Sequence, residues 1–176
     1  GKFGHAAGQT EMDAACRFCP GGWYSDSEGD TACVACIAGK YGLIDGRRDS
    51  EGAACSDCPN GQYGDEAGKQ SVAAACSNYC AQGKFGDLPG RTSEDTACSD
   101  CPAGSFCAGV AQKAPCPAGK YGDLALAIQH EEAAGCPNAC PAGRFGTSVG
   151  QTEMEAACPF LCPLGERGHA LGQTAK

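Results

Sequence analysis

The sequence is poor in the residues that build large cores and most catalytic sites. Its 176 residues include one tryptophan, two methionines and three histidines, and long aliphatic side chains are scarce in most stretches. No apolar run approaches the length needed to cross a membrane, so we expect no membrane insertion within this segment. Hydrophobic burial alone cannot be expected to hold such a fold together.

Catalytic signatures are also missing. The sequence contains no Gly-x-Ser-x-Gly elbow, phosphate-binding loop, paired His-Glu helix or dinucleotide fingerprint. Of the histidines His5, His130 and His169, the first and last occupy the same place in Gly-His-Ala strings, as residues inherited with a repeat do. The acidic residues are scattered and never form the alternating string of a calcium-binding loop. We expect a protein that is not an enzyme and has no cofactor or bound metal.

The charge pattern excludes further classes of partner. The formal net charge is −8, with acidic and basic residues interspersed rather than in blocks, which argues against nucleic acid or anionic lipid. The first residues show no signal peptide and open in the middle of a repeated pattern, so we expect a mature piece of a longer chain. Sequons of the Asn-x-Ser/Thr form are absent, because Asn60, Asn78 and Asn138 lack Ser or Thr two residues on.

What the sequence does contain is a repeat. Each copy opens with glycine and an aromatic residue, continues through a polar stretch and closes on two nearby cysteines, usually followed by Pro, Ala and Gly. A period of about twenty residues is typical of small structural units that stack on their neighbours, and it predicts an elongated, solenoid-like rod. We number the repeats 1 to 8 over residues 1–20, 21–38, 39–60, 61–82, 83–103, 104–118, 119–142 and 143–164, and a partial repeat follows over 165–176.

Cysteine and glycine stand out in the composition, with 16 and 27 residues. A brick of about twenty residues is too small for a stable core of its own, and proteins solve that problem with disulfides or metal. An even cysteine count in a loop-rich chain favours disulfides and an extracellular or cell-surface location. The cysteines form the pairs Cys16/Cys19, Cys33/Cys36, Cys55/Cys58, Cys76/Cys80, Cys98/Cys101, Cys136/Cys140 and Cys158/Cys162, with Cys107 and Cys116 in a shortened repeat.

Zinc binding is the alternative use of these cysteines. Cys16-x2-Cys19, followed after thirteen residues by Cys33-x2-Cys36, has the spacing of a zinc ribbon. Two features favour disulfides instead. The cysteines of a pair are separated by two residues in some repeats and three in others, whereas a tetrahedral metal site tolerates little change. Proline follows the second cysteine in five of the pairs, and proline supplies no N–H where thiolate sulfurs usually collect them.

Two kinds of string carry a resemblance to a known family: Cys101-Pro-Ala-Gly-Ser-Phe-Cys107 and the recurring Thr-Ala-Cys-x-x-Cys-Pro-Ala-Gly-Lys-Tyr-Gly type. The chain resembles the ephrin-receptor-like cysteine-rich repeats, cousins of the tumour-necrosis-factor-receptor modules, whose multiplied arrays occur in large surface and secreted proteins of algae and other protists. The resemblance covers essentially the whole chain. It implies the fold and leaves the function open, because such modules are ligand-binding ectodomains in some proteins and spacers or structural arrays in others.

In that family a cysteine closing one repeat commonly bonds to the first cysteine of the next. Carried over, the resemblance implies the disulfides Cys19–Cys33, Cys36–Cys55, Cys58–Cys76, Cys80–Cys98, Cys101–Cys107, Cys116–Cys136 and Cys140–Cys158. The Cys101–Cys107 loop is shorter than is usual in the family. Cys16 and Cys162 are left over, and we expect disulfides from them to neighbouring segments of the array, because an odd thiol in a secreted protein suggests intermolecular pairing.

The aromatic residues keep the rhythm of the repeat. Eight of the twelve lie at the third position of their repeat, where a flat ring can pack against the neighbouring disulfide: Phe3, Trp23, Tyr41, Tyr63, Phe85, Phe106, Tyr121 and Phe145. We interpret this register as core packing, with a stacked aromatic binding face as the alternative. Glycines at the start of a repeat and after the ring, such as Gly39 and Gly42, predict positive φ or close backbone approach beside short two-stranded ladders.

A further signal precedes the first cysteine of several repeats. The strings Thr10-Glu-Met-Asp13, Ser93-Glu-Asp-Thr96 and Thr152-Glu-Met-Glu155 resemble a capping box leading into one helical turn. A hydroxyl group lies five or six residues before that cysteine at Thr10, Ser50, Ser71, Ser93 and Thr152. We expect these side chains to cap helices or form turns, and the alternative is that they carry O-linked glycans.

Together these features predict a small disulfide-rich repeat protein, an elongated solenoid-like rod of short β-ladders and turns with single helical turns and little other regular secondary structure. We expect a structural component of an extracellular fibre, appendage or cell-surface stalk, whose partners are further copies or a continuation of the same array, and glycans. The alternative is a ligand-binding or adhesion ectodomain of a receptor, and an intracellular zinc-binding array ranks lower. The segment 104–118 departs most from the pattern and is a candidate bend or docking point.

Overall fold

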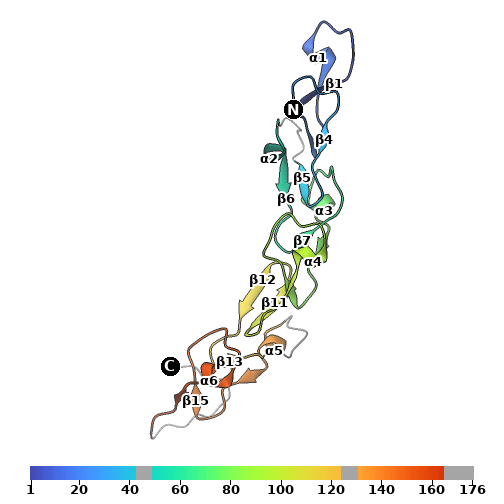
Figure 1. The fold of residues 1–176 in the computed structure, drawn as a ribbon. Coiled ribbons are helices and arrows are strands. Elements are labelled where there is room, and N and C mark those ends of the chain that lie inside the picture. Colours follow the sequence, from blue (N-terminus) through green and yellow to red (C-terminus); the bar gives the residue numbers. More distant parts are fainter. Residues whose placement is uncertain (43–48, 124–130, 165–176) are drawn as a thin grey trace. The chain divides into compact units, whose positions relative to one another are not determined.

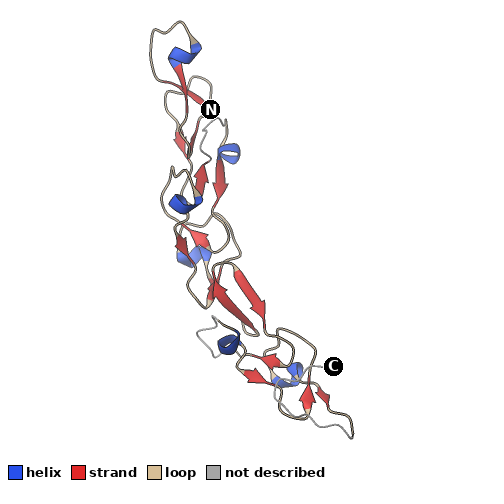
Figure 2. Cartoon of the chain, turned by 180° about the vertical axis from the view of Figure 1, so that it is seen from behind, coloured by secondary structure: helices blue, strands red, loops and turns tan. Residues whose placement is uncertain are grey.

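A computed structural model describes residues 1–42, 49–123 and 131–164 of the chain. Within these ranges the regular elements are short strands and single-turn helices, separated by loops (Figure 2). The helices are α1 (Met12–Ala15), α2 (Glu51–Ala54), α3 (Val72–Ala75), α4 (Glu94–Ala97), α5 (Glu132–Gly135) and α6 (Met154–Ala157). None of these helices is long and apolar enough to cross a membrane.

The strands form two-stranded antiparallel sheets, each joining the glycine–aromatic segment of a repeat to the segment that precedes its last cysteine. The pairs are β1 (Lys2–Gly4) with β2 (Cys16–Phe18), β3 (Trp23–Tyr24) with β4 (Val34–Ala35), β5 (Lys40–Gly42) with β6 (Cys55–Asp57), β7 (Gln62–Tyr63) with β8 (Asn78–Tyr79), β9 (Lys84–Phe85) with β10 (Ser99–Asp100), β11 (Ser105–Gly109) with β12 (Gln112–Pro115), β13 (Lys120–Tyr121) with β14 (Asn138–Ala139) and β15 (Arg144–Phe145) with β16 (Phe160–Leu161). These ladders and helical turns confirm the predicted small disulfide-rich fold with little regular structure.

The chain forms two compact bodies. The first comprises Gly1–Tyr79 and Gly86–Ala97 and contains β1 to β8 and α1 to α4. The second comprises Cys80–Phe85 and Cys98–Lys176 and contains β9 to β16, α5 and α6. Within the first body, helix α3 of repeat 4 lies beside strand β5 of repeat 3 (Figure 1), so elements of consecutive repeats pack on each other.

The helical turns lie where the sequence predicts them, but most of the predicted caps do not form. Helices α1 and α6 begin after Glu11 and Glu153, whose side chains make no capping hydrogen bond. The capping boxes predicted at Thr10 and Thr152 are therefore wrong, because each hydroxyl lies one residue too early in the chain. Only at Ser71, among the caps that the structure details, does a side chain accept a hydrogen bond from the helix, with Ala74 N donating over 3.3 Å.

Small core clusters in the described residues combine cysteines of a disulfide, an alanine and a tyrosine ring. Tyr41 packs against Cys58, Ala75 and Cys76, and the same arrangement recurs where Tyr121 packs against Cys140, Ala157 and Cys158. Ring-on-disulfide packing is thus confirmed in these two repeats. The helical turn delivers the buried alanine immediately before the first cysteine, which explains why so short a helix recurs.

In repeat 2 the predicted ring is wrong by one residue. Trp23 is 37% exposed, whereas Tyr24 is 9% exposed and packs with Cys36, Ala54 and Cys55. The repeat starts structurally at Gly22, because the carbonyl of Gly22 accepts the hydrogen bond from Cys36 N, as Gly39 does from Cys58 N in repeat 3. The Gly21-Gly22 doublet offers two possible starts, and burial of the tyrosine selects the second.

The irregular repeat 6 contains a hairpin. Strands β11 and β12 have five and four residues, the longest pair in the described ranges, and their register shifts between Phe106 and Gly109. Val110 at the hairpin turn has φ of 57°, a conformation that β-branched residues rarely adopt. In six of the other repeats a helical turn lies between the two strands; the hairpin of repeat 6 has none, and neither does the described loop of repeat 2 between β3 and β4.

Candidate functional site: the joints between repeats

Disulfides join each repeat to its successor. The seven bonds are Cys19–Cys33, Cys36–Cys55, Cys58–Cys76, Cys80–Cys98, Cys101–Cys107, Cys116–Cys136 and Cys140–Cys158, with Cα–Cα distances of 5.5 to 5.8 Å. They are the same seven pairs that the family resemblance implies. All of these cysteines except Cys33 and Cys101 are buried, so the bonds form the interior of the joints as well as their covalent links.

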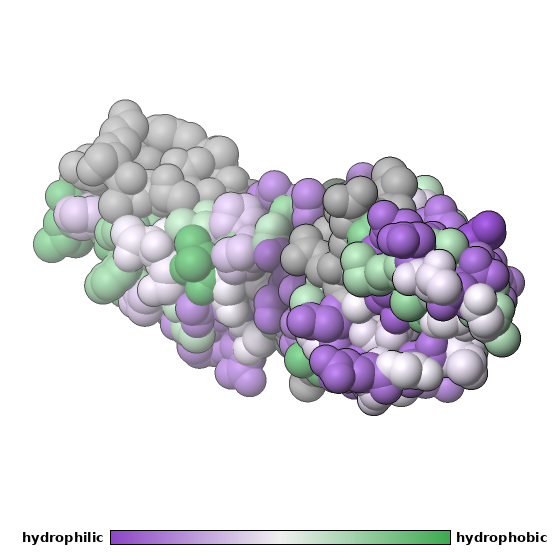
Figure 3. All heavy atoms as spheres, turned by 90° about the horizontal axis from the view of Figure 1, so that it is seen from above, coloured by the Kyte–Doolittle hydropathy of each residue, from purple (hydrophilic) through white to green (hydrophobic). Residues whose placement is uncertain are grey.

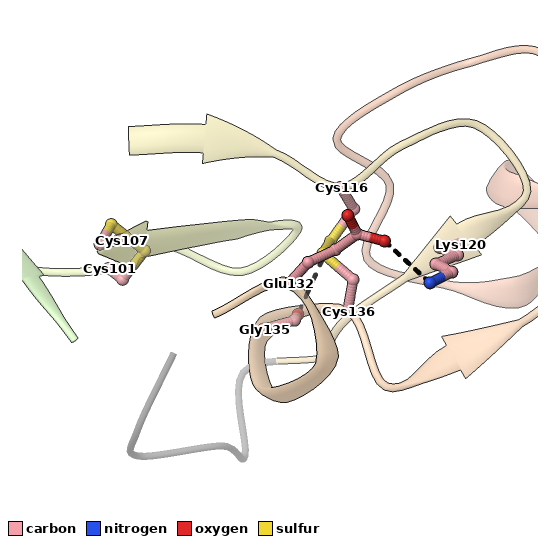
Figure 4. The surroundings of a disulfide bond; sticks show 7 residues. All are labelled: Cys101, Cys107, Cys116, Lys120, Glu132, Gly135 and Cys136. Atoms are coloured by element: carbon pink, nitrogen blue, oxygen red, sulfur yellow. Dashed lines mark hydrogen bonds and ion pairs between the residues drawn. A yellow bond between two sulfur atoms is a disulfide. The ribbon is translucent and has the colours of Figure 1, made fainter. Parts of the chain in front are cut away.

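The Cys116–Cys136 bond shows how a joint is built (Figure 4). Helix α5 lies against the disulfide, and Sγ of Cys116 is 3.6 Å from the carbonyl oxygen of Gly135. On the outside of the same helical turn, Glu132 forms an ion pair of 2.8 Å with Lys120. The helical turn thus contacts the buried disulfide on its inner side and forms the ion pair on its outer side.

Cys16 and Cys162 are free thiols, each partly exposed. Cys16 lies at the repeat position of Cys33 and Cys55, and Cys162 lies at the position of Cys36 and Cys58. The disulfides predicted from them to neighbouring segments remain a prediction.

Glycine loops form a second kind of joint, which reaches two repeats along the chain. We call the loop glycines Gly68, Gly90 and Gly150 knobs. Each knob donates its N–H to the carbonyl of the cysteine that closes the repeat two before its own: Gly68 to Cys36 over 2.9 Å, Gly90 to Cys58 over 2.9 Å and Gly150 to Cys116 over 2.8 Å. Every one of these contacts lies within a single body of the structure.

Each knob rests on the glycine that starts the receiving repeat. We define a seat as this glycine together with the carbonyl group of the cysteine that closes the same repeat. The three occupied seats are Gly22/Cys36, Gly39/Cys58 and Gly104/Cys116. A Cβ atom on Gly22, Gly39 or Gly104 would lie less than 3.0 Å from the carbonyl oxygen of the knob. These three glycines also have φ near 80°, so both the backbone conformation and the close approach require glycine. This confirms the prediction of positive φ and close backbone approach.

The lysine at the second position of several repeats forms ion pairs. Lys2 bonds to Asp13 over 3.0 Å, and Lys40 lies 3.3 Å from Glu51 and 3.5 Å from Asp57. Partial burial opposes the charge on Lys40, but hydrogen bonds to the two acids and their charges outweigh it and raise the pKa of Lys40 above its ordinary value. Since the acidic side chains of these pairs remain 36% to 88% exposed to solvent, each pair adds little to stability.

The candidate glycan sites are accessible. The side chains of Thr10, Ser50, Ser71, Ser93 and Thr152 are all exposed. Ser71 is engaged in the cap of α3, and Ser93 Oγ lies 3.0 Å from Thr96 Oγ1. O-glycosylation stays a prediction for these residues.

The structure describes one of the three histidines. His5 Nδ1 lies 3.1 Å from the carbonyl oxygen of Ala15 on an exposed surface, and His130 and His169 lie outside the described residues. Among the residues that the structure describes, no three His, Cys, Asp or Glu side chains gather as metal ligands would.

The chain matches no protein-family model and no curated protein. The resemblance to ephrin-receptor-like repeats therefore depends on the motif strings alone.

Sequence reasoning did not identify the knobs as a class. Gly68, Gly90 and Gly150 lie in loops with otherwise different sequences, Asp-Glu-Ala-Gly-Lys, Asp-Leu-Pro-Gly-Arg and Thr-Ser-Val-Gly-Gln. The available signal was spacing: each knob follows the glycine after the aromatic ring by four residues.

Proposed function

We propose that the chain is a structural component of an extracellular fibre, appendage or cell-surface stalk, in which disulfide-laddered repeats form an elongated, solenoid-like rod. The observation that carries this proposal is the recurrence of one joint, a disulfide to the next repeat combined with a knob from the repeat after that. A chain that uses its buried residues for linking repeats is organised for mechanical continuity.

The disulfides support an extracellular or cell-surface location. Fourteen of the sixteen cysteines are bonded to each other, and such a set of bonds persists in oxidising compartments. Sulfurs in disulfides are not thiolate ligands, so this bonding also disfavours the zinc-binding alternative.

The surface supports a structural role over a dedicated binding site. The face seen in Figure 3 mixes hydrophilic and hydrophobic residues rather than presenting one large apolar area. Exposed hydroxyls provide attachment points for O-glycans, which would be the surface partners of a secreted rod.

The test is electron microscopy of the native material, with and without a reductant. We expect filaments or stalks that carry an antibody label raised against this chain and that fragment when thiols reduce the disulfides. A label confined to isolated receptors in the plasma membrane would contradict the structural role.

One observation favours the alternative of a ligand-binding or adhesion ectodomain. Repeat 8 exposes Val149, Phe160 and Leu161, which are 55%, 48% and 66% exposed. Exposed apolar residues of this kind are typical of interaction sites. Two results together would support this alternative. The chain would bind a cell-surface ligand that the Phe160→Ser variant no longer binds, and the native material would contain no filaments.

A further inference from the structure

Three knobs and three seats are occupied in the described residues, and a fourth knob and a fourth seat have no partner among those residues. Gly8 has the features of a knob: it follows Gly4 by four residues, and its φ of 71° matches the 71°, 68° and 70° of Gly68, Gly90 and Gly150. No described atom lies within 4 Å of a Cβ placed on Gly8. The loop of repeat 1 therefore presents a knob that meets no seat among the described residues.

The open seat lies in repeat 8. Gly143 has φ of 88°, and its carbonyl accepts a hydrogen bond from Cys162 N over 3.0 Å, as Gly39 accepts from Cys58. Unlike the glycines of the three occupied seats, Gly143 has no described atom within 4 Å of a Cβ placed on it, and no described residue donates to the carbonyl of Cys162. Gly143 and Cys162 thus form a seat whose backbone geometry is complete.

The surface beside this seat also matches the occupied ones. A knob lies against one side chain of the cross-strand pair next to the seat: Trp23 beside Gly68, Asp57 beside Gly90 and Pro115 beside Gly150. The corresponding pair in repeat 8 is Arg144 with Leu161, and Leu161 is 66% exposed. An arriving knob would lie against this leucine.

We propose that the Gly8 knob of one copy of this chain docks into the Gly143/Cys162 seat of a second copy. The inference rests on the proposed structural role and names its assembly contact. In the joint, Gly8 N–H donates to the carbonyl of Cys162, and the carbonyl of Gly8 lies against the Cα of Gly143, reproducing the contacts of the three internal joints. A contact between different surfaces of identical copies continues from copy to copy and builds a filament.

Gly29 is a weaker candidate for the same seat. Its Cβ position is also open, with φ of 84°. The residue four positions earlier is Ser25 rather than glycine, and its buried hydroxyl donates to the carbonyl of Lys2 over 3.0 Å and to Asp30 over 2.9 Å. The Gly29 loop is tied to repeat 1 as the knob loops are tied to the repeat before their own, since Gly4 N donates to the carbonyl of Asp30 over 2.7 Å as Gly42 N donates to that of Lys69. The spacing from the glycine after the ring is therefore what favours Gly8.

The test uses the 176-residue chain with its free thiols replaced, C16S and C162S, so that only non-covalent association is measured. Sedimentation equilibrium should show reversible association. Gly143→Asn should weaken it by about tenfold or more, since its Cβ would meet the carbonyl of the knob. Asparagine tolerates positive φ, so the isolated chain should keep its fold, checked by seven intact disulfides and an unchanged unfolding midpoint.

Two further variants make the result specific. Gly8→Asn should also weaken association, because in the three internal joints a Cβ on the knob would lie only 3.0 to 3.5 Å from the side chain beside it and asparagine adds further atoms. Mixing the two variants should restore a dimer and nothing longer, because each retains the surface that the other lacks. Gly52→Asn is the control, because Gly52 has negative φ and open space around it, and it should associate like the parent chain.

Three results would overturn the joint. They are a parent chain that stays monomeric at millimolar concentration, association that survives both Gly8→Asn and Gly143→Asn, and a mixture of the two variants that forms no dimer. If the native filaments are seen but the parent chain fails these assays, the structural role stands and the joint is wrong. If the joint forms but no filaments exist in the native material, the structural role is wrong.

Discussion

The glycine after the aromatic ring provides a sharp test of how the repeats are packed. In repeat 4, a Cβ on Gly64 would overlap the carbonyl oxygen of Ala75, which precedes the first cysteine. In repeat 1, a Cβ on Gly4 would lie 3.6 Å from the carbonyl oxygen of Asp30, an ordinary contact. Neither glycine has positive φ, so alanine suits both backbones and only the neighbours differ.

The expected cost of Gly64→Ala follows from what must move. Gly64 accepts a hydrogen bond from Gly39 N over 2.9 Å and donates one to the carbonyl of Arg91 over 3.2 Å. Forcing a methyl group into a packed site costs about 1–3 kcal/mol, and each weakened hydrogen bond adds about 1 kcal/mol. We expect a loss of about 3 kcal/mol in the free energy of unfolding. Gly4→Ala should change it by less than about 1 kcal/mol, because alanine also restricts the unfolded chain.

The assay is guanidinium unfolding of the oxidised chain, followed by the fluorescence of Trp23. This is the sole tryptophan of the sequence, and it lies in the same body as both glycines. Gly64→Ala should unfold at a much lower denaturant concentration than Gly4→Ala. Equal midpoints for the two variants would refute the packing argument, because they would mean that the carbonyl of Ala75 is free to move away.

Tyr24→Ala should cost about 3 kcal/mol and Trp23→Ala less than that, because Tyr24 is 9% exposed and Trp23 37%. Circular dichroism during unfolding measures both costs, and a reversed order would restore Trp23 as the core ring. Ser71→Ala should cost about 1 kcal/mol through loss of the cap on α3, and a cost near zero would show that the cap bond is weak. Replacing Cys58 and Cys76 together by alanine should cost about 3 kcal/mol, as expected for a bond across 18 residues, while an unchanged midpoint would contradict a stabilising role for the disulfide.

The sequence predicts the ladders, the helical turns and the packing of the rings of Tyr41 and Tyr121 because these depend on local spacing. The errors have local causes too. Two adjacent glycines leave the start of repeat 2 ambiguous, and the chain stays extended through Glu11 and Glu153, which moves the helix start beyond the predicted hydroxyls. The spacing of the knobs is visible in the sequence, but their contacts could not be predicted from it, because a knob and its seat lie two repeats apart and no pattern within one repeat encodes that contact.

The stepwise disulfides have a consequence for a chain under tension. With all seven bonds intact, the covalent path from Cys19 to Cys158 crosses each bond and the few residues between bonds, and bypasses every closed loop. Fully stretched, this path is about 130 Å long, against about 470 Å for the reduced polypeptide. Even a completely unfolded array would therefore reach its maximum length at this shorter distance, and any further pulling force would act on the sulfur–sulfur bonds. The redox state of its surroundings would then decide whether the same sequence resists extension or can be stretched to several times this length.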